Sequence, residues 1–184
     1  MVGTTIFAMG NYKKYLFFFI LGLLVGIAAY FAFPHVLPSA LPSVVAIFSP
    51  EEGDQIIDLI DSSKESLSIE MYVFTSDEIA DALKRAHDRG VDVRLILEKR
   101  VATEDNPKNY AELKDYGIAV RWASTGYQLT HAKFTIVDGK AVLVGSHNFS
   151  NAAMRKNREA SVIVTGSTVE EFKQVFEQDW ILAG

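Results

Sequence analysis

The 184-residue chain has no cysteine, which excludes disulfide bonds, a thiolate nucleophile and cysteine metal ligands. Its four histidines show no metal-ligand spacing such as His-Glu-x-x-His, so we expect no metal and no other cofactor. The net charge is −5, or −7 once the two lysines near the N-terminus, Lys13 and Lys14, are set apart. The chain therefore lacks the overall positive field of a non-specific nucleic-acid binder.

Charge is also missing from residues 15–33, a run of nineteen residues close to the roughly 20 that span a bilayer as a helix. We expect a transmembrane helix there, after a short cytoplasmic N-terminus over residues 1–14. Lys13 and Lys14 precede the run, which by the positive-inside rule places the following domain on the outer side. A cleaved signal peptide, with a secreted domain, is the alternative, although its usual apolar core is only about 7–15 residues long.

The remainder of the chain predicts a short spacer and one domain. Three prolines mark residues 34–43 as a stiff spacer, and residues 44–184 have the usual size of one domain. Strands are predicted over 44–48, 67–74, 91–97, 118–122, 134–137, 141–144 and 160–164, and helices over 54–65, 77–89, 107–116 and 168–179. Strands that alternate with helices and then form a hairpin predict an α/β sandwich with a mixed sheet flanked by helices.

The most informative pattern is His131-Ala132-Lys133, followed by Asp138 and then Gly145-Ser146-His147-Asn148. An imidazole can attack phosphorus, and a lysine two residues away lies on the same face of a strand, where it can hold a phosphate oxygen. Taken singly, His131 is typical of a structural histidine and Lys133 of a solvated strand lysine. The coincidence of five identities at fixed spacing favours phosphodiester chemistry.

The spacing His-x-Lys-x4-Asp-x6-Gly-Ser-x-Asn resembles the signature of the phospholipase D superfamily. Upstream, residues 48–50, 68–75 and 82–94 are similar to the single-motif branch, which contains the Nuc-type nucleases and the Zucchini or mitochondrial phospholipase D proteins. The resemblance extends from about Val45 to Trp180 and implies a phospholipase D-like fold.

The resemblance also implies a role for each motif residue. His131 would attack phosphorus and form a phosphohistidine, while Lys133 and Asn148 stabilise charge on the phosphoryl oxygens and Ser146 assists through its hydroxyl. His147 occupies a variable position of the motif and receives no role. These assignments make the expected reaction independent of metal.

Two further carboxylates belong to the candidate catalytic set. Glu159 stands where family members carry a glutamate that orients the catalytic histidine, although without the resemblance it reads as an ordinary strand-start residue. Asp138 belongs to the motif, but Asp138-Gly139 lies between two apolar runs and predicts a hairpin turn. We therefore interpret Asp138 mainly as a turn residue.

The chain contains a single His-x-Lys pair, so the resemblance implies a homodimer in which His131 of each subunit meets in a shared site. One histidine would act as nucleophile and the other as general acid, then base. We expect an endonuclease on single-stranded nucleic acid, with a membrane-anchored phospholipase D as the alternative. The polar loop 100–108 favours the nuclease.

For the basic residues and one tyrosine near the motif, the sequence allows two alternative roles. The basic residues of 99–100 and 155–158 can rim the substrate cleft or simply be solvated loop charges. Tyr127 can stack an unpaired base or pack against the protein.

Overall fold

The computed structural model describes residues 4–32, 42–101 and 105–184. The chain divides into two units, Met1–Ala40 and Leu41–Gly184. The predicted spacer lies mostly outside the described residues, as does the middle of the loop 100–108.

The first unit contains the helix α1 (Thr4–Ala32), which begins well before the predicted span and includes Lys13 and Lys14. Its segment Tyr12–Phe31 has a mean hydropathy of 2.0 and none of it is buried, so it is long and apolar enough to cross a membrane. A signal sequence near an N-terminus meets the same criteria.

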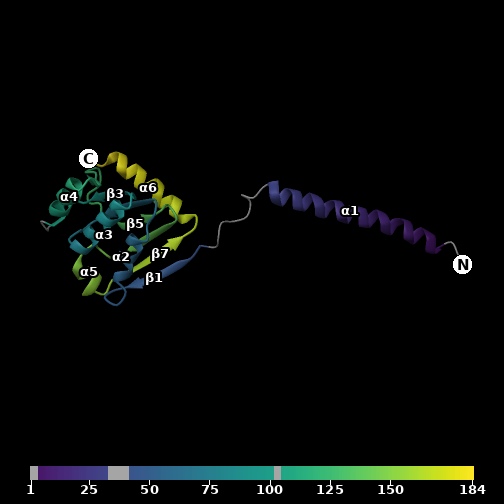
Figure 1. The fold of residues 1–184 in the computed structure, drawn as a ribbon, viewed down its shortest axis with the longest axis horizontal. Helices are drawn as coiled ribbons and strands as arrows, with labels where there is room; N and C mark the ends of the chain where they lie inside the picture. Colours follow the sequence, from purple (N-terminus) through teal and green to yellow (C-terminus); the bar gives the residue numbers. More distant parts are fainter. Residues whose placement is uncertain (1–3, 33–41, 102–104) are drawn as a thin grey trace. The chain divides into compact units, whose positions relative to one another are not determined.

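The second unit, drawn as a ribbon in Figure 1, is built on one mixed sheet of seven strands. Their order is β1-β7-β6-β5-β2-β3-β4. The pairs β2–β3 and β3–β4 are parallel, and the other four pairs are antiparallel. The strands are β1 (Val44–Phe48), β2 (Ser66–Met71), β3 (Asp92–Leu97), β4 (Ala119–Trp122), β5 (Lys133–Val137), β6 (Ala141–Gly145) and β7 (Ala160–Thr165). Every predicted strand is present.

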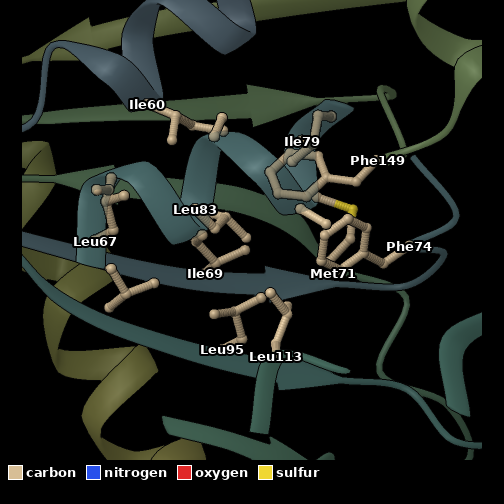
Figure 2. Close-up of a cluster of buried hydrophobic side chains, with 14 of the residues drawn as sticks. Ile60, Leu67, Ile69, Met71, Phe74, Ile79, Leu83, Leu95, Leu113 and Phe149 are labelled. Atoms are coloured by element: carbon tan, nitrogen blue, oxygen red, sulfur yellow. The ribbon is translucent and has the colours of Figure 1, made fainter. Parts of the chain in front are cut away.

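Helices cover both faces of this sheet, which confirms the predicted α/β sandwich. The helices are α2 (Asp54–Asp61), α3 (Asp77–Asp88), α4 (Asp105–Asp115), α5 (Asn151–Arg155) and α6 (Thr168–Leu182). The helices α2 to α5 share one apolar core with the sheet, where Leu67, Ile69 and Met71 of β2 lie near Ile79 and Leu83 of α3 (Figure 2). A second core packs α6 against the opposite face.

Local signals explain most of these elements. The helix α3 begins after Ser76, whose hydroxyl accepts a hydrogen bond from the Ile79 amide at 3.4 Å, and it is followed by Gly90 at φ +85°. The sequence did not predict the short helix α5. Its signal was Ser150, which caps the helix by accepting from the Ala153 amide at 3.1 Å.

The strand directions bring several chain segments to one edge of the sheet. Strands β1, β2, β3, β4 and β6 end at this edge, whereas β5 and β7 begin there, because each antiparallel pair reverses direction. We call it the His131 edge, after the residue that lies just before β5. The motif residues on either side of β5 and β6 are brought together here.

Candidate active site

His131 is exposed at the His131 edge and is held from two neighbouring strands. Its ring centroid lies 4.3 Å from that of Tyr72, which follows β2. The preceding residue, Thr130, donates its amide to a carboxylate oxygen of Glu98, after β3, at 2.7 Å. The imidazole is therefore anchored by its surroundings yet open to a substrate.

Lys133 is the first residue of β5, where it pairs with Met71 of β2. Its Nζ donates to the backbone oxygen of His131 at 3.0 Å and lies 3.4 Å from His131 Nδ1. Burial lowers the pKa of Lys133, while the negative charge of Glu159 opposes that shift. The cation and the imidazole are adjacent, as the two-residue spacing predicted.

Ser146 and Glu159 meet across the ends of β6 and β7. The Ser146 hydroxyl donates to Glu159 Oε2 at 2.5 Å and accepts from the Ala160 amide at 3.0 Å. Glu159 Oε1 accepts from the Asn157 side chain at 3.1 Å. Burial raises the pKa of Glu159, but these hydrogen bonds and the nearby positive charges outweigh it, so the net pKa is lowered. Glu159 thus favours its ionised form.

Gly145 permits this close approach of β6 and β7. A Cβ at Gly145 would lie 2.3 Å from the Ser161 hydroxyl and 2.4 Å from the backbone oxygen of Ala160. Any side chain at this position would push the two strands apart, because both distances are far below van der Waals contact. The glycine of the motif is required by backbone packing rather than by chemistry.

Asn148 is half-buried and points its amide oxygen at the end of β2. Asn148 Oδ1 accepts from the Val73 amide at 3.3 Å, which leaves the amide nitrogen as a donor. The next residue, Phe149, is fully buried against Phe74, with ring centroids 5.5 Å apart. This buried pair fixes the loop after β6 against the segment after β2.

Asp138 lies away from these residues, in the turn between β5 and β6. It adopts φ +53°, followed by Gly139 at φ +60°, as expected for a two-residue hairpin turn. Its carboxylate accepts from the backbone amides of Lys64, Glu65 and Ser66 at 3.0, 2.7 and 3.0 Å. The length of β5, about 16 Å for five residues, separates it from Lys133. The geometry therefore supports the turn role and places Asp138 outside the cluster.

His147 is buried beside this cluster, with a relative exposure of 3%. Its Nδ1 lies 2.7 Å from the Ser161 hydroxyl, and among the described residues Nε2 has no hydrogen-bond partner. Burial lowers the pKa of His147, while Glu159 opposes the shift. Burial in the neutral form is consistent with the sequence analysis, in which His147 receives no catalytic role.

The pair formed by Glu98 and Arg100 was not predicted from the sequence. Glu98 has no exposed side-chain surface, and its two oxygens accept from Arg100 at 2.7 and 2.8 Å as well as from Thr130. Arg100 also donates to the backbone oxygen of Tyr127 at 2.8 Å. Together they hold the loop that leads into His131. The available signal was a carboxylate directly after the apolar strand, with an arginine two residues later.

The basic residues after the motif are engaged in ion pairs. Arg155 contacts Asp54 and Glu78 at 2.9 and 2.7 Å, and Arg158 contacts Glu51 at 2.8 Å. These ion pairs favour the interpretation of the two arginines as solvated surface charges over a role at the substrate cleft. Within the described ranges, no group of three or more His, Cys, Asp or Glu side chains is arranged to hold a metal ion.

Comparison with known proteins decides the family. Residues 56–180 match the family model described as "Cardiolipin synthase, PLD-like domain". The chain belongs to this phospholipase D-like family. The chain is 32% identical to the phospholipase D family member Nuc from Salmonella typhimurium, whose crystal structure aligns with a TM-score of 0.73 over 78% of this chain and 97% of Nuc. The predicted family and fold are thereby confirmed.

Relatives of this phospholipase D-like chain have names that point to lipids. A mitochondrial cardiolipin hydrolase from Chlamydomonas reinhardtii is 30% identical over 133 residues, covering 72% of this chain and 59% of that protein. A phospholipase D from Rickettsia bellii is 28% identical and covers 89% of this chain and 90% of its own length. The chain spans less than two thirds of the length of the cardiolipin hydrolases it resembles, such as those of Chlamydomonas reinhardtii and Xenopus tropicalis.

Proposed function

We propose that the chain is a metal-independent phosphodiesterase that cleaves single-stranded nucleic acid through a phosphohistidine. The observation that carries the proposal is the cluster at the His131 edge. An exposed imidazole, the adjacent Lys133 ammonium, and the Ser146 hydroxyl and Asn148 amide lie on segments that converge there. The cluster combines a nucleophile with two donors for a phosphate, Lys133 and Asn148, while the Ser146 hydroxyl donates to Glu159.

In the first step, Nε2 of His131 attacks phosphorus. A P–N bond forms as the bond to the leaving oxygen breaks, and that oxygen takes a proton from a general acid. Lys133 and Asn148 donate to the non-bridging oxygens, where negative charge accumulates in the transition state. In the second step water attacks the phosphohistidine, loses its proton to the same group, and the P–N bond breaks.

Nε2 can attack only if the imidazole proton resides on Nδ1, and that proton needs an acceptor. The Lys133 ammonium beside Nδ1 cannot accept a hydrogen bond. We propose Glu159 as the acceptor. Its negative charge opposes the lowering by burial of the pKa of Lys133, the neighbour of His131, and its own lowered pKa keeps it ionised. The bonds from Ser146 and Asn157 occupy two of its roughly four acceptor positions, so others remain for Nδ1–H.

The general acid must come from a second imidazole, since the chain has one His-x-Lys pair. We propose a twofold homodimer in which His131 of a second copy lies opposite the first. The exposure of His131 supports this arrangement, because a shared site requires both histidines at the surface of their own chain. Each histidine can then serve as nucleophile while the other transfers the proton.

A phospholipase D reaction on membrane lipid is the second candidate function. The helix α1 and the names of the cardiolipin hydrolase relatives favour it. The same two displacement steps apply to either substrate, because both carry a phosphodiester. The substrates differ in what surrounds that group, so a direct comparison separates them.

The test is to offer the full chain in detergent three substrates in excess chelator: labelled single-stranded DNA, labelled RNA and cardiolipin in mixed micelles. We expect cleavage of nucleic acid, and we expect His131→Asn to reduce it at least about 10³-fold because the nucleophile is lost. His87→Asn, on α3, is the matched control and should retain activity. Cleavage of cardiolipin alone, or loss in chelator that a divalent ion restores, would overturn the proposal.

We also propose that α1 anchors the chain in a membrane with the second unit on the outer side. Lys13 and Lys14 precede the apolar segment, which supports that orientation. A reporter enzyme fused after Gly184 should be active only outside the cytoplasm. Activity only in the cytoplasm would reverse the orientation, and release of a shortened protein would indicate a signal peptide.

A further inference from the structure

A cavity of about 390 Å³ lies at the His131 edge, where β3 and β4 end. Its lining includes Lys99, Trp122, Ser124 and Thr125. In the order β5-β2-β3-β4, the strands β3 and β4 are two and three positions from β5, which is roughly 10–15 Å at the usual strand spacing. A phosphate under attack by His131 therefore cannot also occupy this cavity.

The charges around the cavity favour the binding of an anion. The guanidinium of Arg100 is paired with the buried Glu98, whereas Lys99 has no carboxylate partner within the part of the chain that the structure describes. No Asp or Glu side chain is among the described residues that line the cavity. Lys99 is therefore a positive charge available to a ligand.

The cavity wall is held in place before any ligand arrives. The Trp122 ring stacks on Tyr110 with centroids 4.0 Å apart and an interplanar angle of 7°, and Lys99 Nζ lies 5.9 Å over the same indole. The backbone of Trp122 exchanges two hydrogen bonds with Gly184, at 2.8 and 3.0 Å. A cation over a fixed aromatic ring loses little conformational freedom when it binds a ligand.

Hydroxyl groups complete the set of donors. Ser124 Oγ accepts from the Gly126 amide at 3.1 Å, which leaves its own proton to donate, and the Thr125 side chain is exposed beside it. An ammonium with neighbouring hydroxyl donors, and no Asp or Glu side chain among the described lining residues, is a donor set that suits phosphate oxygens. The ligand class is therefore a phosphate.

We propose that this cavity binds a second phosphate of the same substrate strand that His131 cleaves. The inference rests on the proposed nuclease function and adds a substrate contact to it. The loop that begins with Ser124 runs directly to His131, and Arg100 and Glu98 hold that loop at Tyr127 and Thr130. The cavity and the cluster thus form one surface, which a single strand with several phosphates can follow.

The test compares a substrate that has many phosphates with one that has a single phosphate. Lys99→Gln should lower kcat/KM for a labelled single-stranded oligonucleotide about tenfold, through KM, because one charge-assisted contact is lost. It should also reduce the slope of log binding against log salt by about 0.7, the value for one phosphate on a single strand. Hydrolysis of bis(p-nitrophenyl) phosphate, which has one phosphate, should not change.

The matched control is Lys64→Gln, which removes the same charge from the opposite edge, just before β2. Equal effects of Lys99→Gln and Lys64→Gln on an oligonucleotide that is cleaved would overturn the cavity assignment and leave the nuclease standing. A wild-type chain that hydrolyses the small diester but no oligonucleotide would overturn the nuclease itself. A loss restricted to cardiolipin hydrolysis would assign the second phosphate to a lipid and overturn the nucleic-acid assignment.

Discussion

Replacing Asp138 separates structure from chemistry within the motif. Asp138→Ala removes the carboxylate that accepts from the amides of Lys64, Glu65 and Ser66. Asp138→Asn keeps the size of the side chain and one acceptor oxygen, but removes the charge. If Asp138 acts through the turn, both variants should be less stable while the surviving folded protein keeps its kcat.

The magnitude follows from the three amides and the backbone angle. At a half-buried position each amide-to-carboxylate bond contributes about 1 kcal/mol, so the three contribute about 3 kcal/mol. Alanine at φ +53° adds about 1 kcal/mol of strain, whereas asparagine tolerates this region well. We therefore expect a loss of about 4 kcal/mol for Asp138→Ala and about 1–2 kcal/mol for Asp138→Asn.

Urea unfolding followed by tryptophan fluorescence measures this loss, because both tryptophans, Trp122 and Trp180, belong to the second unit. With a slope of about 2 kcal/mol per molar urea, the Asp138→Ala midpoint should fall by about 2 M. Burial raises the pKa of Asp138, but the hydrogen bonds from the three backbone amides lower it by more than burial raises it. The net pKa of Asp138 is therefore lowered. Its contribution is therefore present above the unfolded pKa and is lost as the pH falls through the folded pKa.

The difference in stability between wild type and Asp138→Asn should accordingly shrink below about pH 5. Asp115→Ala, at an exposed site, serves as the control and should leave the midpoint unchanged. A hundredfold loss of kcat in an Asp138 variant with wild-type stability would refute the reasoning, because the carboxylate would then act in the reaction. An unchanged midpoint for Asp138→Ala would refute it as well.

Two further predictions concern the shared site and the loop before His131. In an equal mixture of wild type and His131→Asn with subunit exchange, activity should fall to about one quarter, because only wild-type pairs hold two imidazoles. A value near one half would show independent sites. Glu98→Gln should lower kcat about tenfold with little change in KM, because an amide NH₂ replaces an acceptor that faces Arg100 and Thr130. Unchanged kcat and KM would contradict a positioning role for Glu98.

Much of the fold could be predicted because its signals are local. Alternating apolar residues and the Asp138-Gly139 turn each depend on a few neighbours, and the structure contains every predicted strand and the predicted hairpin turn. The contact of His131 with Lys133 is also local, since only one residue separates the two and Lys133 is the first residue of β5. The sequence by itself therefore determined the sandwich, the hairpin and the imidazole–ammonium pair.

Tertiary structure alone decided the contacts between distant segments. Thr130 meets Glu98 across 32 positions, Asn148 meets Val73 across 75, and Tyr72 lies against His131 from another strand. No local pattern encodes such contacts, because they depend on which strands are neighbours in the sheet and where each one ends. For the same reason, the cavity beside Lys99 exists only once β3 and β4 end at the edge where β5 begins.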